Sequence, residues 1–355
     1  MLTIAEKLDY IPALASVALT FVWALLTVVV RAPQYPTHWL LHIGYAVFRK
    51  LTARLSGAQM QYVLPPTNLL YNRYIRSVRQ KPLTVNLDHG AMGHWIGNPD
   101  AKNILVWYHG GGFTLPANMG YFKFWAQIIA ESERNGQSLA IFALSYTLTP
   151  VATYPTQLRQ AIEALRYILV EKRHPAGNIM LGGDSAGGNL VGGVLSHLAH
   201  THPAIDPLKL NEDELIAGAV LIAPWTILQP DLSNRIVDSR GDLITPGVGP
   251  LWGAEYIGKA PKDNYTDLSD APPEWFAKFP IRKILVCAGE REILFPVIED
   301  FVEKLRAGFK GDVEFCIGKG EGHVAPVYNL YLGDNRETHQ GARAKSFIRQ
   351  LLVKM

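Results

Sequence analysis

Six short apolar runs, separated by longer amphipathic stretches, constrain the fold of this 355-residue chain more than any other feature. Polar residues seldom alternate with apolar ones inside these runs, which is typical of strands buried on both faces of a sheet. Parallel strands meet this condition because each crossover between them carries a helix that covers one face. The runs cover residues 103–108, 138–144, 178–181, 217–223, 281–288 and 312–317.

The segments between the runs show the periodicity of amphipathic helices. After Pro155, which suits a first helical turn, apolar residues from Leu158 to Leu169 recur at i, i+3, i+4 and i+7. The alternation of strand and helix predicts a doubly wound α/β fold, with a mostly parallel sheet flanked by helices. Further helices are predicted at 122–134, 187–200, 297–309 and 337–353, and one or two leading antiparallel strands at 83–96.

Two stretches, 32–81 and about 225–279, do not follow this alternation. Irregular segments of such length in a compact domain are usually functional, and ligands of open α/β sheets bind beyond the carboxyl ends of the strands. We therefore expect both stretches to form a helical cap over a pocket. The alternative is that they only decorate the surface.

The first thirty-one residues differ from the rest of the chain. Residues 10–30 carry no charge, and about 20 apolar residues in a helix are enough to span a bilayer. A cleaved signal peptide and a buried core helix are the alternatives. The charged start, with Glu6, Lys7 and Asp9, and the lack of a small-x-small site before Arg31 favour an uncleaved, single-pass membrane anchor at 1–31. The basic residues on its two sides nearly balance, so the topology stays open.

Composition excludes several classes of protein. Apolar residues make up 48% of the chain and charged residues 18%, which excludes general disorder. The 34 Lys and Arg against 31 Asp and Glu give a net charge of +3, too small and dispersed for a nucleic-acid partner. Cys287 and Cys316 cannot form a disulfide framework and lack zinc-site spacing, so we expect reduced thiols and no metal.

The strongest chemical motif is Gly183-Asp184-Ser185-Ala186-Gly187, which follows a predicted strand and precedes a predicted helix. A G-x-S-x-G sequence in this context forms a nucleophile elbow, whose glycines permit a turn so tight that the serine Oγ is presented at the sheet edge. The sequence therefore predicts Ser185 as a nucleophile.

The strand ending at Tyr108 leads directly into His109-Gly110-Gly111-Gly112-Phe113. Acyl transfer places negative charge on the carbonyl oxygen, and preorganised N–H donors stabilise that charge. Glycines allow the backbone to approach the oxygen closely. We therefore predict an oxyanion hole made by the N–H groups of Gly111, Gly112 and Ala186, with a structural role for His109.

The base and the acid are predicted from chain order, which in this architecture is Ser, acid, His. His323 lies in a glycine-rich loop after the last predicted strand and is the expected general base. The loop after residue 288 offers Glu290 and Glu292 and no aspartate. Glu292 is our preferred acid, and Glu290 is the alternative.

Together, HGGGF, GDSAGG with Asn189, the stretch from Gly289 to Leu294 and the late Gly-His resemble the hormone-sensitive-lipase family of α/β-hydrolase esterases. With the anchor, the chain is similar to the membrane-bound members, namely arylacetamide deacetylase and the fungal steryl acetyl hydrolases. The resemblance implies an α/β-hydrolase domain at 32–355, no cofactor, hydrolysis of short acyl esters and a cap built partly from the N-terminal region. One departure is Glu292, where the family usually has aspartate.

The resulting prediction is a carboxylesterase or deacetylase that cleaves short acyl, most simply acetyl, esters of a lipophilic alcohol such as a sterol or secondary metabolite. The expected partners are that small substrate and membrane lipid, and the expected location is the endoplasmic reticulum membrane. Two alternatives stay open: an acyltransferase or cyclising biosynthetic enzyme with the same triad, and a catalytically silent small-molecule binding protein on the same fold. The oligomeric state is not predicted.

Overall fold

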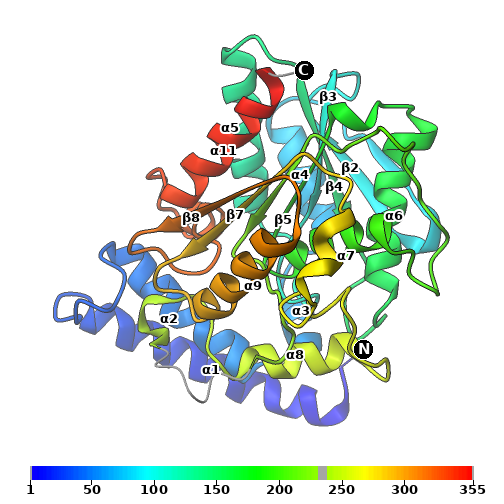
Figure 1. Ribbon diagram of the computed structural model, residues 1–355. Coiled ribbons are helices and arrows are strands. Elements are labelled where there is room, and N and C mark those ends of the chain that lie inside the picture. Colours follow the sequence, from blue (N-terminus) through cyan, green and yellow to red (C-terminus); the bar gives the residue numbers. More distant parts are fainter. Residues whose placement is uncertain (1, 231–237, 354–355) are drawn as a thin grey trace.

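The computed structural model describes residues 2–230 and 238–353, and its centre is an eight-stranded sheet (Figure 1). The strand order is β1-β2-β4-β3-β5-β6-β7-β8. Strand β2 runs antiparallel to both of its neighbours, and all other neighbouring strands are parallel. The strands are β1 (Thr84–Asn86), β2 (Met92–Ile96), β3 (Asn103–Tyr108), β4 (Leu139–Ser145), β5 (Ile179–Asp184), β6 (Gly218–Ile222), β7 (Lys283–Gly289) and β8 (Asp312–Gly318).

All six apolar runs form strands, and the leading antiparallel pair is also present, so the predicted α/β fold is confirmed. The runs are continuous because alternate residues enter different cores. In β3, Val106 and Tyr108 belong to the core on one face, whereas Leu105 and Trp107 belong to the core on the other face. The cysteines, paired in register on β7 and β8, are free thiols as expected.

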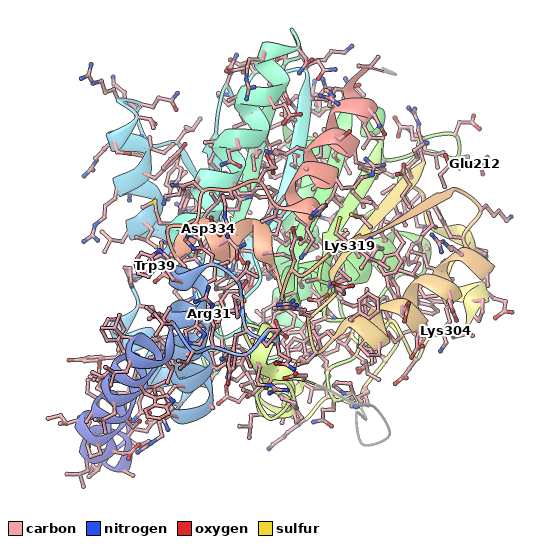
Figure 2. All side chains as sticks on the ribbon, turned by 90° about the vertical axis from the view of Figure 1, so that its left-hand side faces the viewer. Arg31, Trp39, Glu212, Lys304, Lys319 and Asp334 are labelled. Carbon is pink, nitrogen blue, oxygen red and sulfur yellow. The ribbon has the colours of Figure 1, made fainter. Side chains whose placement is uncertain are left out.

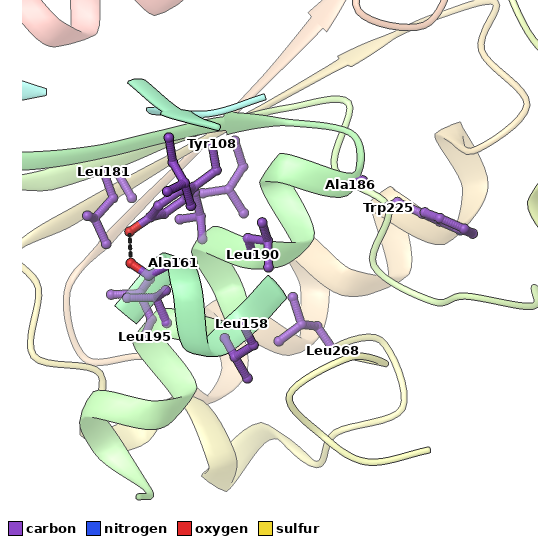
Figure 3. Packing of buried hydrophobic residues seen from close by; sticks show 14 of the residues in the cluster. Tyr108, Leu158, Ala161, Leu181, Ala186, Leu190, Leu195, Trp225 and Leu268 are labelled. Carbon is purple, nitrogen blue, oxygen red and sulfur yellow. Dashed lines mark hydrogen bonds between the residues drawn. The ribbon is translucent and has the colours of Figure 1, made fainter. Parts of the chain in front are cut away.

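Helices cover both faces of the sheet (Figure 1). Helices α5 and α11 pack on one face of the sheet, and α6, α7 and α9 pack on the other. On this second face, the Tyr108 hydroxyl of β3 donates a hydrogen bond to the Ala161 carbonyl oxygen of α6 at 3.0 Å (Figure 3). The helices are α1 (Ile4–Thr27), α2 (Trp39–Arg54), α3 (Gly57–Val63), α4 (Thr67–Ser77), α5 (Met119–Arg134), α6 (Thr156–Arg166), α7 (Ala186–Ala199), α8 (Val248–Ile257), α9 (Phe295–Gly308), α10 (Ala325–Tyr331) and α11 (His339–Val353).

Helix α1 is the one helix within the described residues that is long and apolar enough to cross a membrane. It begins at Ile4, six residues before the predicted apolar segment, because Thr3 and Glu6 form a capping box that starts the helix within the charged region. Its first turns are held against the body by Asp9, whose carboxylate binds the Arg54 guanidinium at 2.6 Å, and by Glu6, which accepts from the Ser56 hydroxyl at 2.6 Å.

The outward face of α1 is strongly apolar. Figure 2 shows this helix at the outer edge of the molecule, with side chains pointing away from the body. Small residues such as Ala13 and Ala24 are buried on its inner face. The large side chains that are more than two-thirds exposed are Ile4, Leu8, Ile11, Leu19, Trp23 and Leu26.

The two stretches that do not follow the alternation contain helices, as expected of a helical cap, although the sequence analysis did not assign their positions. Helices α2, α3 and α4 occupy 32–81, and α8 lies within 225–279, of which residues 231–237 fall outside the described chain. Helix α8 contains Gly249, Pro250 and Gly253, which are poor helix formers. Its helical form therefore depends on tertiary packing, notably of the buried Trp252 and Tyr256.

Candidate active site

Ser185 lies in a tight turn between β5 and α7, with φ 49° and ψ −117°. A non-glycine residue adopts such angles only where its surroundings impose them, at a cost of about 1–3 kcal/mol. Gly183 and Gly187, on either side of Ser185, must be glycines because neighbouring backbone atoms leave no room for a Cβ at these positions. A Cβ on Gly183 would lie 2.3 Å from the Gly187 carbonyl oxygen, and one on Gly187 would lie 1.9 Å from the Tyr108 carbonyl oxygen.

Three predicted side chains meet at the carboxyl ends of β5, β7 and β8. His323 Nε2 lies 2.9 Å from Ser185 Oγ, and His323 Nδ1 lies 2.8 Å from Glu292 Oε2. All three residues are buried. Glu290, the alternative acid, is exposed and accepts a hydrogen bond from Gly320 N–H at 2.8 Å. The geometry thus places Glu292, and not Glu290, against the imidazole.

Burial controls the protonation of this group. It raises the pKa of Glu292 well above its usual value, an effect that the Gly289 N–H bond partly opposes, and it lowers the pKa of His323. The charges of Asp242 and Asp184 oppose the decrease at His323. A histidine with a lowered pKa is neutral at physiological pH, and only the neutral imidazole can accept a proton.

The glycine loop after β3 presents free N–H groups beside Ser185. Gly111 and Gly112 line the same pocket as Ser185 and have φ of 103° and 60°. A Cβ on Gly112 would lie 2.0 Å from the Trp252 ring, so a larger residue does not fit. Across residues 2–230 and 238–353, no group accepts a hydrogen bond from the N–H of Gly111, Gly112 or Ala186. These three donors are available to a ligand oxygen.

Buried polar groups hold this loop in place. The Asp184 carboxylate accepts from the Tyr121 hydroxyl at 2.6 Å and from Gly110 N–H at 3.2 Å. His109 stacks on Tyr146, and its Nδ1 lies 2.8 Å from the Gly110 carbonyl oxygen. Burial lowers the pKa of His109 to about 4. His109 therefore packs within the loop, in agreement with the structural role predicted for it, whereas the hydrogen bond to Ser185 Oγ comes from His323.

The pocket above Ser185 is small and apolar, with a volume of about 40 Å³. Both stretches outside the alternating pattern contribute to it: Phe48 comes from α2, and Val248 and Trp252 come from α8. Ile293, next to Glu292, also lines it. These side chains leave little free space beside the serine.

Asp242 belongs to the site, although the sequence analysis did not single it out. Its Oδ1 accepts from the N–H groups of His323 at 2.7 Å and Leu243 at 2.6 Å, and its Oδ2 accepts from Ile293 N–H at 2.8 Å. One buried carboxylate thus joins the loop of His323 to the loop of Glu292. Burial raises the Asp242 pKa to about 6. A lone aspartate in an irregular stretch gives no sequence signal for this position.

Comparison with known proteins assigns the chain to a family. The family model described as α/β hydrolase fold matches residues 105–327, which is more than half of the chain. The chain belongs to the α/β-hydrolase fold family. The matched range includes the glycine loop, the serine elbow, Glu292 and His323 of this α/β-hydrolase.

The relatives of this α/β-hydrolase include enzymes acting on esters. It is 26% identical over 242 residues to probable carboxylesterase 7 of Arabidopsis thaliana, covering 64% of this chain and 72% of that one. It is 31% identical over 133 residues to steryl acetyl hydrolase 1 of Saccharomyces cerevisiae, a match that covers 36% of this chain and only 28% of the relative.

Solved structures share the fold. A bacterial esterase of the hormone-sensitive lipase family superposes with a TM-score of 0.63 at 20% identity, covering 91% of this chain and 99% of the other. The predicted resemblance to the hormone-sensitive-lipase family is confirmed by a sequence match to hormone-sensitive lipase of Homo sapiens, 27% identical over 176 residues, which covers 47% of this chain and 14% of that one. Within the described ranges, no cluster of three or more His, Cys, Asp or Glu is arranged to hold a metal ion.

Proposed function

We propose that this α/β-hydrolase is a serine carboxylesterase that removes a small acyl group, such as acetyl, from an ester of a lipophilic alcohol. The single observation that carries the proposal is the continuous contact from Ser185 Oγ through His323 to Glu292, beside three unpaired N–H donors. Such an arrangement is suited to acyl transfer through a covalent intermediate.

The proposed reaction has two steps. Ser185 Oγ attacks the ester carbonyl carbon while His323 Nε2 takes the hydroxyl proton, and Glu292 stabilises the imidazolium that forms. The carbonyl oxygen becomes an oxyanion and accepts hydrogen bonds from Gly111, Gly112 and Ala186. His323 then returns the proton to the departing alcohol oxygen. Water, deprotonated by the same histidine, attacks the acyl-enzyme, releases the acid and restores the serine.

Two observations support a small acyl group on a lipophilic alcohol. The pocket at Ser185 has a volume of only about 40 Å³ and is lined in part by Trp252 and Phe48. Among the relatives, one from Saccharomyces cerevisiae is named a steryl acetyl hydrolase. The two stretches that bring Phe48 and Trp252 to the pocket act, in this proposal, as the cap.

A series of p-nitrophenyl esters from acetyl to palmitoyl tests this function in the 355-residue chain solubilised in detergent. We expect kcat/KM to be highest for acetyl or butyryl and to fall at least tenfold by octanoyl, because a longer acyl chain exceeds the pocket. Well-folded protein without activity on every ester would contradict the proposal and favour a silent binding protein. A maximum at palmitoyl would contradict the short-chain assignment.

We also propose that α1 binds the lipid bilayer. Its outward face carries large apolar side chains, and an exposed apolar surface of this extent marks a membrane or interaction site. Replacing Leu19, Trp23 and Leu26 by serine is expected to release the protein from sedimenting membranes. Serine at the exposed Val170 and Val353, which lie at the ends of other helices, is the matched control and should leave sedimentation unchanged. Equal release of both variants would contradict a specific role for α1.

Asp242 is expected to position His323 and Glu292. Replacing Asp242 by asparagine removes the negative charge and turns an N–H donor toward one of the three backbone N–H groups that now donate to the carboxylate. Losing charge-assisted hydrogen bonds costs ~1.5–3 kcal/mol. We therefore expect kcat/KM to fall about 10- to 100-fold. Above its own pKa of about 6, Asp242 is negative and raises the pKa of His323. Without that charge the His323 pKa decreases, so the acid limb of the kcat/KM profile should move to lower pH.

The control for Asp242 is Asp334→Asn. Asp334 is also a buried aspartate that accepts from a backbone N–H, that of Arg336, but it lies outside the site. We expect this variant to keep the wild-type pH profile. An Asp242→Asn protein with unchanged activity and an unmoved acid limb would show that the carboxylate has no positioning role.

A further inference from the structure

A second cavity, much larger than the pocket at Ser185, lies between α1, α2, α3 and α10. Its volume is about 430 Å³, within the ~300–1,000 Å³ typical of small-molecule sites. We call it the α1–α2 cavity. Its walls include Phe21 and Leu25 of α1, Ile43 and Val47 of α2, and Met60 of α3.

The lining of the α1–α2 cavity is almost entirely hydrocarbon. Among its side chains only Thr52, Trp39 and Tyr331 carry a polar atom. The Thr52 hydroxyl is already used, because it donates to the Phe48 carbonyl oxygen of its own helix at 3.0 Å. An unpaired polar group would lose several kcal/mol of hydration in such surroundings. The cavity therefore selects an apolar body without charges.

The α1–α2 cavity adjoins the pocket at Ser185. Phe48 and Leu115 line both spaces, so these two side chains form the boundary between them. Leu115 belongs to the loop of the proposed oxyanion hole, since its N–H donates to the Gly111 carbonyl oxygen at 2.8 Å. A molecule that occupied both spaces would have to pass between these two side chains.

The cavity is also next to the helix proposed to meet the bilayer. Phe21 and Leu25 lie on α1, and Trp39, which is half exposed at the start of α2 and labelled in Figure 2, also lines the cavity. A lipophilic molecule dissolved in a membrane can thus enter beneath α1 without crossing water.

We infer that the α1–α2 cavity binds the alcohol part of the ester, a bulky hydrocarbon alcohol, while the acyl group occupies the small pocket at Ser185. The inference rests on the proposed function and deepens it by giving the alcohol its own site. The volumes agree with this division, because the α1–α2 cavity of about 430 Å³ leaves much more room for a bulky group than the pocket of about 40 Å³ at Ser185.

Filling the cavity tests this assignment. Val47, half-buried, lines the α1–α2 cavity but not the pocket at Ser185, and tryptophan there would occupy much of the space. For Val47→Trp we expect the ratio of kcat/KM for cholesteryl acetate to kcat/KM for p-nitrophenyl acetate to fall at least tenfold. Val170→Trp, on an exposed helical turn away from both spaces, is the matched control and should leave both rates unchanged.

Three outcomes would overturn the inference. One is an unchanged ratio in folded Val47→Trp; another is the same decrease in Val170→Trp. The third is a wild-type protein that hydrolyses p-nitrophenyl acetate but not cholesteryl acetate, which leaves the esterase function intact. If Val47→Trp fails to fold, Val63→Trp at the half-exposed end of α3 takes its place, because it fills the same cavity from its rim.

A binding measurement separates this inference from catalysis. In the Ser185→Ala background, the fluorescent sterol dehydroergosterol should bind at least tenfold more weakly when Val47→Trp is added. Equal affinity in both proteins would overturn the cavity assignment even if the esterase function holds. Loss of ester hydrolysis has no influence on this readout.

Discussion

Ser185→Ala should lose about 10⁵- to 10⁶-fold in kcat toward p-nitrophenyl acetate, the scale found when a triad nucleophile is removed. The reason is that the covalent step disappears, while the N–H groups of Gly111, Gly112 and Ala186 still stabilise an oxyanion formed by direct attack of water. Residual hydrolysis about 10³- to 10⁴-fold above the uncatalysed rate is therefore expected.

The matched control for this substitution is Ser132→Ala. Ser132 is buried like Ser185, but its hydroxyl donates to the Ile128 carbonyl oxygen within α5. The Ser132→Ala protein should keep full turnover and react with a fluorophosphonate probe, whereas the Ser185→Ala protein should not react. Full activity or labelling in Ser185→Ala would exclude Ser185 as the nucleophile and contradict the proposed acyl-enzyme mechanism.

The sequence predicted those parts of the fold and site that depend on local patterns. The strands were recognisable because burial on both faces leaves continuous apolar runs, as in β3. Ser185 and the glycine loop were recognisable because their turns demand glycine at fixed positions, which the close approach of Gly187 to Tyr108 explains. Chain order then indicated His323 and Glu292, and the structure brings them together. Their catalytic roles stay a proposal.

The features that were not predicted depend on contacts between distant segments. Asp242 acquires its role only because the loops of Ile293 and His323 fold onto it, 51 and 81 residues away. Likewise, the α1–α2 cavity is formed by residues from α1, α2, α3 and α10, and no one segment contains its pattern. Helix α8, rich in glycine and proline, is stabilised by packing and not by propensity. Such properties require a three-dimensional structure.

Glu292→Gln is expected to lower kcat about 10⁴-fold, comparable to amide replacement of the acid in a serine triad. Glutamine has the same length and can still bond to His323, but its amide N–H would donate to Nδ1. The histidine proton would then lie on Nε2, which could no longer accept the proton of Ser185. KM should change little, because Glu292 does not line the pocket that contains Ser185. Glu290→Gln, exposed and bonded to Gly320, is the control and should keep wild-type kcat.

Glu292→Asp distinguishes the contribution of the negative charge from that of the side-chain length. Aspartate restores the acceptor but is one methylene shorter, and the present contact of 2.8 Å to His323 Nδ1 is already made by the full length of glutamate. The Gly289 N–H, which holds Oε1 at 3.2 Å, would also lose its partner. We therefore expect activity between those of the wild type and Glu292→Gln. Glu292→Asp as inactive as Glu292→Gln would mean that the loop after β7 is built for glutamate alone, whereas wild-type activity in Glu292→Gln would remove this residue from the triad.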